Sequence, residues 1–276
     1  MPATTGPARA SASWLALREP ADAAARSPEL VEEIRSLLPV AGEVVIHDLG
    51  CGTGSMGRWL AVQLAGRQHW VLHDRDAELL AVAAADPPGS AADGAPVTVE
   101  TRRRDITRLE PRELTGAALI TASALLDTMT AEDLERFVAT CAGAASPVLV
   151  TLTVTGRVEL TPADPFDRRV TEAFNAHQQR TSGAGRLLGP QAVPAAVDGF
   201  ARRGFGVLVR ASPWRLGPGQ AALAAAWFRG WLAAACEQRP ELEAEASAYA
   251  GRRLAEAAAG RLGVTVHHQD LLALPR

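Results

Sequence analysis

Residues 47–57 read His-Asp-Leu-Gly-Cys-Gly-Thr-Gly-Ser-Met-Gly and follow the apolar run Val44-Val45-Ile46. The run is typical of a buried strand, and glycines at positions 50, 52 and 54 predict a tight turn from that strand into a helix. Because these glycines carry no side chain, a ligand can lie directly against the backbone. Asp48 places a charged acceptor for a cationic amine or a hydroxyl at the same end of the strand.

Two cofactors fit such a loop. Gly52 to Gly57 also satisfies the G-x-G-x-x-G dinucleotide pattern, in which a helix N-terminus receives a pyrophosphate and the ligand is NAD. S-adenosylmethionine (SAM) has no phosphate, and its aminocarboxypropyl arm carries an ammonium and a carboxylate. A pyrophosphate beside Asp48 would meet a like charge, so the loop favours SAM, with an NAD-dependent oxidoreductase as the alternative.

Downstream of the loop, apolar runs alternate with helical patterns. Such continuous runs are expected for strands covered on both faces, so we predict an α/β fold with a doubly wound, seven-stranded, mostly parallel sheet. The expected strands are 44–49, 69–74, 97–101, 117–122, 148–154, 205–211 and 264–270, and the expected helices are 55–65, 76–85, 131–143 and 190–203, with a short one near 110–114.

The chain is interpreted as a disordered tail, residues 1–13, and a single domain, residues 14–276. Helices within 14–40 precede the first strand, and Ser27-Pro28 marks the start of the second of them. Two segments exceed what the sheet needs, a polar one at 161–188 and an Ala-rich helical one at 217–263. We expect both insertions to cap the acceptor site, because ligands of doubly wound sheets lie beyond the carboxyl ends of the strands.

Composition excludes several functions. The net charge of −3 and the single basic cluster, Arg102-Arg103-Arg104, argue against a nucleic-acid partner. All 28 basic residues are arginine, which excludes a Walker A loop, a pyridoxal phosphate enzyme and a Tyr-Lys dehydrogenase. The Arg- and Ala-rich composition suggests a GC-rich, actinobacterial source. Three widely spaced cysteines and no signal-like or membrane-spanning segment indicate a cytoplasmic protein without a membrane partner. The sequence leaves the oligomeric state open between monomer and homodimer.

The run Asp48-Leu-Gly50-Cys51-Gly52-Thr-Gly54, the acid that ends Val71-Leu72-His73-Asp74, and Arg104-Asp105-Ile106 together resemble the motifs of class I SAM-dependent methyltransferases. The resemblance covers residues 43–155 clearly and the rest only in topology. It implies that Asp74, with neighbouring Arg75, binds the ribose, and that Asp105 and Ile106 contact the adenine. It also implies that Thr121, Ala122 and Ser123 pass beneath the methionyl arm. An Asn/Asp-Pro-Pro-Tyr motif is missing there, which argues against methylation of amide or base nitrogens.

Three further expectations concern the ends of the reaction site. Arg18 is the candidate for holding the SAM carboxylate, since a guanidinium pairs bidentately with a carboxylate. If the acceptor's nucleophile carries a proton, a general base is needed. His177 is the first candidate, followed by Glu172 and Asp127. No clustered metal-ligand pattern is present, so no metal is expected.

The sequence thus predicts a SAM-dependent methyltransferase acting on a small-molecule acceptor, such as a specialised metabolite. A third reading is a SAM-binding protein without catalytic activity.

Overall fold

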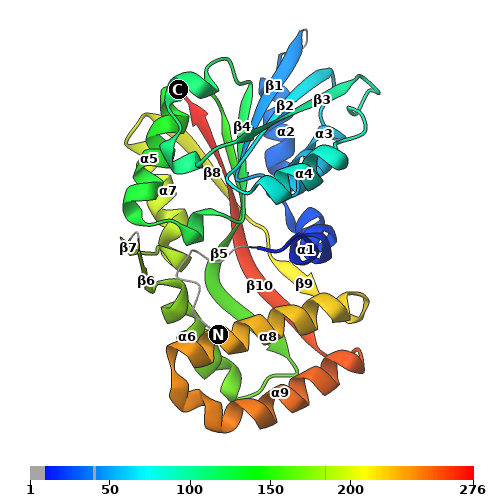
Figure 1. Cartoon of the computed structure of the whole chain (residues 1–276), viewed down its shortest axis with the longest axis vertical. Helices are drawn as coiled ribbons and strands as arrows, with labels where there is room; N and C mark the ends of the chain where they lie inside the picture. Colours follow the sequence, from blue (N-terminus) through cyan, green and yellow to red (C-terminus); the bar gives the residue numbers. More distant parts are fainter. Residues whose placement is uncertain (1–9, 40–41, 184) are drawn as a thin grey trace.

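The computed structural model describes residues 10–39, 42–183 and 185–276. Its centre is a twisted sheet in the order β3-β2-β1-β4-β5-β10-β8, in which β10 runs antiparallel to both neighbours and the other strands are parallel (Figure 1). The predicted doubly wound α/β fold is therefore confirmed. The strands are β1 (Glu43–Leu49), β2 (Arg67–Asp74), β3 (Val97–Arg103), β4 (Leu119–Ser123), β5 (Val148–Thr161), β8 (Phe205–Ala211) and β10 (Gly263–Pro275).

Helices cover both faces of this sheet. Apolar side chains of α2, α3 and α4 pack on one face, and those of α5 and α7 pack on the other, forming two separate cores. Burial on both faces explains why the central strands read as continuous apolar runs. These helices are α2 (Pro28–Leu37), α3 (Ser55–Ala61), α4 (Ala77–Ala85), α5 (Ala131–Gly143) and α7 (Ala192–Ala201), and short 3₁₀ turns include η1 (Ile106–Arg108), η2 (Pro111–Leu114), η3 (Leu126–Thr128) and η4 (Gly189–Gln191).

Strands β5 and β10 extend well beyond the expected ends at 154 and 270, and together they form a long antiparallel ribbon. An unexpected strand, β9 (Trp214–Leu216), pairs with the same part of β10. The register of the ribbon shifts between the pairs Thr153–Gln269 and Val150–Leu271, and Leu152 within this interval has a φ of +58°. The carboxylate of Asp270 accepts a hydrogen bond from the Leu152 N–H at 2.8 Å and so supports this unusual backbone conformation.

The two insertions surround this ribbon. The segment 161–188 forms α6 (Phe166–Gln178) and the hairpin β6 (Thr181–Ser182) and β7 (Gly185–Arg186), whereas 217–263 forms α8 (Ala221–Gln238) and α9 (Glu243–Ala258). Helices α6, α8 and α9 share a third core with the ribbon, centred on Phe228, Trp231 and Tyr249. In Figure 1 they lie beyond the carboxyl ends of β1 and β4, where the sequence places the cap.

The N-terminal segment forms α1 (Ala12–Ala25) and then α2, whose N-cap Ser27 and first residue Pro28 match the expected restart. Residues 1–9 of the predicted disordered tail lie outside the described part, and the tail's last two residues, Ala12 and Ser13, belong to α1 instead. The Ser11 side chain caps this helix by accepting a hydrogen bond from the Trp14 N–H, which explains its earlier start. Across the described ranges, the helices are all too short or too polar to cross a membrane.

Candidate functional site

The glycine loop is fixed by backbone hydrogen bonds to the end of β2. The N–H groups of Gly50 and Cys51 donate to the His73 carbonyl at 2.8 and 3.0 Å. Gly50, Gly52 and Gly54 have φ values of +71°, +55° and +84°, a region that residues with a Cβ rarely adopt. The predicted turn from strand to helix is thus present, with α3 beginning at Ser55.

Asp74 lies directly beside this loop. Its Oδ2 accepts a hydrogen bond from the Gly52 N–H, and its Oδ1 accepts one from the Asp76 N–H, both at 2.9 Å. An ionised carboxylate has about four acceptor sites, so the pair of backbone bonds orients Asp74 and leaves capacity for two hydroxyl donors. Arg75 follows it, and the Arg75 carbonyl accepts a bond from Arg103 Nε at 3.2 Å.

Asp48 is 1% exposed, and its two carboxylate oxygens differ in their surroundings. Thr121 Oγ1 donates to Oδ1 at 2.7 Å, whereas Oδ2 has no hydrogen-bond partner within the described residues. Burial raises the Asp48 pKa to about 7, against the lowering effect of Thr121 and Arg26. A buried acceptor without a donor is costly, and Asp48 Oδ2 is the oxygen of this carboxylate that is available to a donor group of a ligand.

Arg26 is a residue that the sequence reasoning missed. It is 3% exposed, and its Nη2 donates to Ser123 Oγ at 3.2 Å and to Ser55 Oγ at 3.4 Å. Its Nε and Nη1 have no partner in the described part of the chain, and its guanidinium lies 5.1 Å from the ring centre of Trp59. Burial lowers the pKa of Arg26, against the raising effect of Asp22, Asp270 and Asp48. Free donors and a free acceptor of opposite charge are therefore buried near one glycine loop.

Arg18, the expected carboxylate ligand, is engaged elsewhere. Its Nε and Nη2 donate to the two carboxylate oxygens of Asp22 at 2.9 and 3.1 Å, and its guanidinium stacks 4.8 Å from the ring centre of Trp214. Trp214 Nε1 also donates to Asp22 Oδ1 at 2.9 Å. The bidentate edge that Arg18 would present to a cofactor is thus already occupied within the protein.

The expected adenine contacts lie at the end of β3. Asp105 is the N-cap of η1, and its Oδ1 accepts bonds from the Thr107 N–H at 3.1 Å and from Thr107 Oγ1 at 2.7 Å. Ile106 is buried directly behind it. In β4, Thr121 and Ala122 are fully buried, and Ser123 at the strand end accepts from Thr151 Oγ1 at 3.0 Å.

The three expected catalytic residues do not lie on one element. His177 is on α6, with Nε2 3.4 Å from Glu237 Oε2 and Nδ1 3.3 Å from Arg180 Nη1, and burial together with Arg180 lowers its pKa. Glu172, on the same helix, is 51% exposed and lies 3.6 Å from Arg168.

Asp127 is different, because it lies in η3, four residues after Ser123. Burial raises the pKa of its carboxyl group, and Arg18 opposes that rise. Of the three, it alone belongs to the segment that leaves β4.

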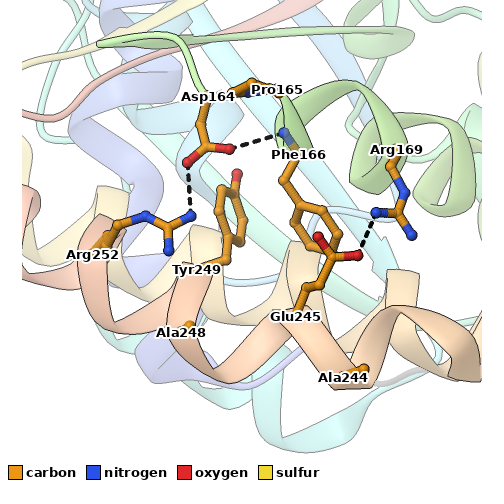
Figure 2. A pocket seen from close by; sticks show the side chains of 9 residues that line it. All are labelled: Asp164, Pro165, Phe166, Arg169, Ala244, Glu245, Ala248, Tyr249 and Arg252. Atoms are coloured by element: carbon orange, nitrogen blue, oxygen red, sulfur yellow. Dashed lines mark hydrogen bonds and ion pairs between the residues drawn. The ribbon is translucent and has the colours of Figure 1, made fainter.

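Two further observations concern a cavity away from the glycine loop and the grouping of possible metal ligands. A cavity of about 360 Å³ opens between the start of α6 and α9, and Figure 2 shows an ion pair at each side of it, Arg252 with Asp164 and Arg169 with Glu245. Both arginines are thus paired within the protein. Among the described residues, no three His, Cys, Asp or Glu side chains are grouped in a way that could hold a metal ion.

Comparison with known proteins finds a family match for the part of the chain that includes β2, β3 and β4. Residues 46–147 match the family described as a methyltransferase domain. Two solved structures share the fold. The cyclopropane synthase MmaA2 from Mycobacterium tuberculosis has a TM-score of 0.50 and 14% identity, covering 95% of this chain and 94% of that chain. The YcgJ protein from Bacillus subtilis has a TM-score of 0.50 and 11% identity, covering 91% and 99%. No curated protein sequence matches the chain.

Proposed function

We propose that the protein is a class I methyltransferase that transfers the SAM methyl group to a small-molecule acceptor. The match of residues 46–147 to a methyltransferase domain supports this proposal. The proposal of a small acceptor rests on one observation: the end of β4 and the glycine loop are covered by other parts of the protein. Ser123, at the end of β4, contacts the buried Arg26, and α1 packs over the glycine loop through Leu15. A compact acceptor suits such a covered site, whereas a duplex would have to flip out a base and a protein would have to insert a terminus or a loop.

The buried polar groups support a specific arrangement of the cofactor. Asp74 accepts hydrogen bonds from the ribose hydroxyls, and Asp105 with Ile106 contacts the adenine. Asp48 Oδ2 accepts from the ammonium of the amino-acid end, and Arg26 donates Nε–H and Nη1–H to its carboxylate. Arg26 takes the role first expected of Arg18, because only Arg26 has both donors unpartnered and buried.

SAM supplies a methyl group that its sulfonium already activates. The chain's contribution is to orient that methyl and to exclude water, and orientation alone is worth up to roughly 7–11 kcal/mol in well-aligned systems. Thr121, Ala122 and Ser123 line the strand end beneath the methionyl arm. Where the acceptor's nucleophile is a hydroxyl, or an amine that enters in its protonated form, Asp127 receives the proton, because a carboxyl with a raised pKa is a better base near neutral pH. His177 and Glu172 are less well suited, because their described neighbours are charged residues of α6, α8 and the turns that follow these helices.

The surface charges support a small acceptor over a nucleic acid. Arg102 pairs with Glu100 at 2.7 Å, and Arg104 lies 3.5 Å from Glu113, so two members of the basic cluster are already neutralised. Phosphate binding requires several free cations on one face. A specialised metabolite of an actinobacterium remains our proposal for the acceptor, on the basis of composition.

The test is methyl transfer from radiolabelled SAM to three separate pools: a small-molecule extract, total RNA with duplex DNA, and dialysed protein. We expect label and S-adenosylhomocysteine (SAH) to form only with the small-molecule extract, and less of both with Asp74→Ala at limiting SAM. Label that enters only the protein or nucleic-acid pool would contradict the proposal.

A further inference from the structure

Two apolar side chains stand on the bare surface of the glycine loop. A Cβ added to Gly50 would lie 3.0 Å from Leu125 Cδ2, and one added to Gly52 would lie 3.1 Å from Leu15 Cδ1. Both distances are shorter than ordinary van der Waals contacts. The surface against which a cofactor would lie is therefore covered by Leu125, from the segment after β4, and by Leu15, from α1.

One arginine ties α1 to this loop. Arg58 of α3 donates from Nε and Nη2 to the two carboxylate oxygens of Glu19 on α1, at 2.8 and 2.6 Å. Its Nη1 donates to the carbonyls of Thr53 in the loop and Asp86 after α4, at 2.7 and 3.0 Å. The Arg58 and Glu19 side chains are 19% and 27% exposed. The same side chain thus holds the loop and the helix that covers it.

The connection between α1 and α2 has the features of a hinge. Arg26, the first residue after α1, has an extended ψ of 141°, and the next residue, Ser27, starts α2 as its N-cap. The Ser27 N–H donates to Asp270 Oδ2 at 2.8 Å, so the start of α2 is fixed to β10. Rotation near Arg26 would therefore move α1 without displacing the start of α2. It would also break the hydrogen bond from Trp214 Nε1 on β9 to Asp22 and separate the Arg18 guanidinium from the Trp214 ring.

We propose that α1 is a gate over the cofactor loop, closed by Leu15 on Gly52, and that it must lift for SAM to bind. Two contacts hold it closed: the Glu19–Arg58 ion pair at the loop, and the hydrogen bond between Asp22 and Trp214 at β9. This inference rests on SAM as the cofactor and not on the acceptor. If the closed form dominates, the apparent affinity is the intrinsic affinity reduced by the open fraction. Weakening either contact then raises the association rate and the affinity by the same factor.

The experiment measures SAH association by stopped-flow tryptophan fluorescence, without any acceptor. Trp14 on α1 and Trp59 beneath Arg26 provide the signal. We expect Glu19→Gln to speed association roughly twofold to fivefold, the range that a partly exposed ion pair contributes. Leu15→Ala should speed it at least as much, because it removes the side chain over Gly52.

The matched control is Glu135→Gln on α5, away from the loop. It breaks the ion pairs of Glu135 with Arg202 and Arg203, which follow α7. Its association rate should equal that of the wild type. Unchanged or slower association with Glu19→Gln would overturn the gate, because α1 would then not obstruct the cofactor. Since Glu19→Gln keeps the shape of the side chain, the test stands even if Leu15→Ala fails to fold. An unknown acceptor leaves this outcome unaffected, whereas a wild type that binds no SAH would refute the cofactor and the gate together.

Discussion

Replacing Arg26 with methionine tests the arrangement of the cofactor's amino-acid end. The substitution keeps an unbranched side chain over Trp59 but removes the two unpartnered donors, Nε–H and Nη1–H. Hydrogen bonds involving charged groups contribute roughly 1.5–3 kcal/mol, and every 1.4 kcal/mol is tenfold in affinity. We therefore expect Arg26→Met to weaken SAH binding by about 10- to 150-fold.

The assay is calorimetric titration with two ligands. SAH carries the amino-acid end, whereas 5′-methylthioadenosine has the same adenosine without it. Arg26→Met should lose affinity for SAH and keep its affinity for 5′-methylthioadenosine. Arg18→Met is the matched control, and because Arg18 is bound to Asp22, it should affect both ligands little and equally.

Two results would refute this reasoning. An equal loss for both ligands would mean that Arg26 only supports the fold of the loop. An SAH affinity that Arg26→Met leaves unchanged would mean that the carboxylate binds elsewhere.

Three further predictions concern buried titratable groups. Because Asp48 must be ionised to bind an ammonium and its pKa is about 7, calorimetry should show SAH affinity falling roughly tenfold per unit below pH 7, and Asp48→Asn should abolish that slope; a slope retained in the variant would assign the titration to another group. Burial lowers the pKa of His47 and His73 to about 4, so their protonation favours unfolding and their contribution to stability is lost as pH falls from 6.5 to 4. Between pH 7 and pH 5, the free energy of unfolding measured with urea should fall by up to ~2 kcal/mol less in His47→Gln than in the wild type; an equal fall in both proteins would contradict the assignment. Asp270→Asn keeps only one acceptor oxygen, so either the Leu152 N–H or the Ser27 N–H loses its partner and faces an amide NH2, and the free energy of unfolding should fall by roughly 2–4 kcal/mol. The exposed Glu245→Gln should change it little, and a similar loss in both variants would argue against a special role for Asp270.

The central sheet could be predicted because its information is local. Strands β1, β2 and β4 each contain a short apolar run, and the helices after β1 and β2 start at Gly54 and at the capping residue Asp76. The extension of β5 could not be predicted in the same way. It depends on Leu152 in a left-handed conformation that the sequence disfavours, and this is stabilised by Asp270, 118 residues later in the chain.

The residues of the candidate site show the same difference between local and long-range information. Asp48 and Asp74 could be predicted, because each lies next to the loop in sequence or ends the neighbouring strand. The sequence analysis expects Arg18 to hold the SAM carboxylate and does not consider Arg26, which we propose in its place. Arg18 and Asp22 are four residues apart on a helix, the spacing of an ion pair, so Arg18 was the arginine already provided with a partner. No local pattern shows that Arg26 lies beneath Ser55 and Ser123, because those contacts span 29 and 97 residues.

The unpartnered atoms of Arg26 and Asp48 also explain why the cofactor should stabilise the protein. A buried donor or acceptor without a partner costs roughly 1–3 kcal/mol, and a folded protein retains such a cost where a ligand relieves it. Saturation at a hundred times the dissociation constant adds ~2.7 kcal/mol to stability, provided that only the folded form binds. At ligand concentrations scaled to each variant's own dissociation constant, that gain is the same for any variant. At one fixed SAH concentration, the stabilisation by SAH must instead be smaller in Arg26→Met than in the wild type. A smaller rise in melting temperature in the variant therefore indicates that cofactor binding relieves the buried charge of Arg26.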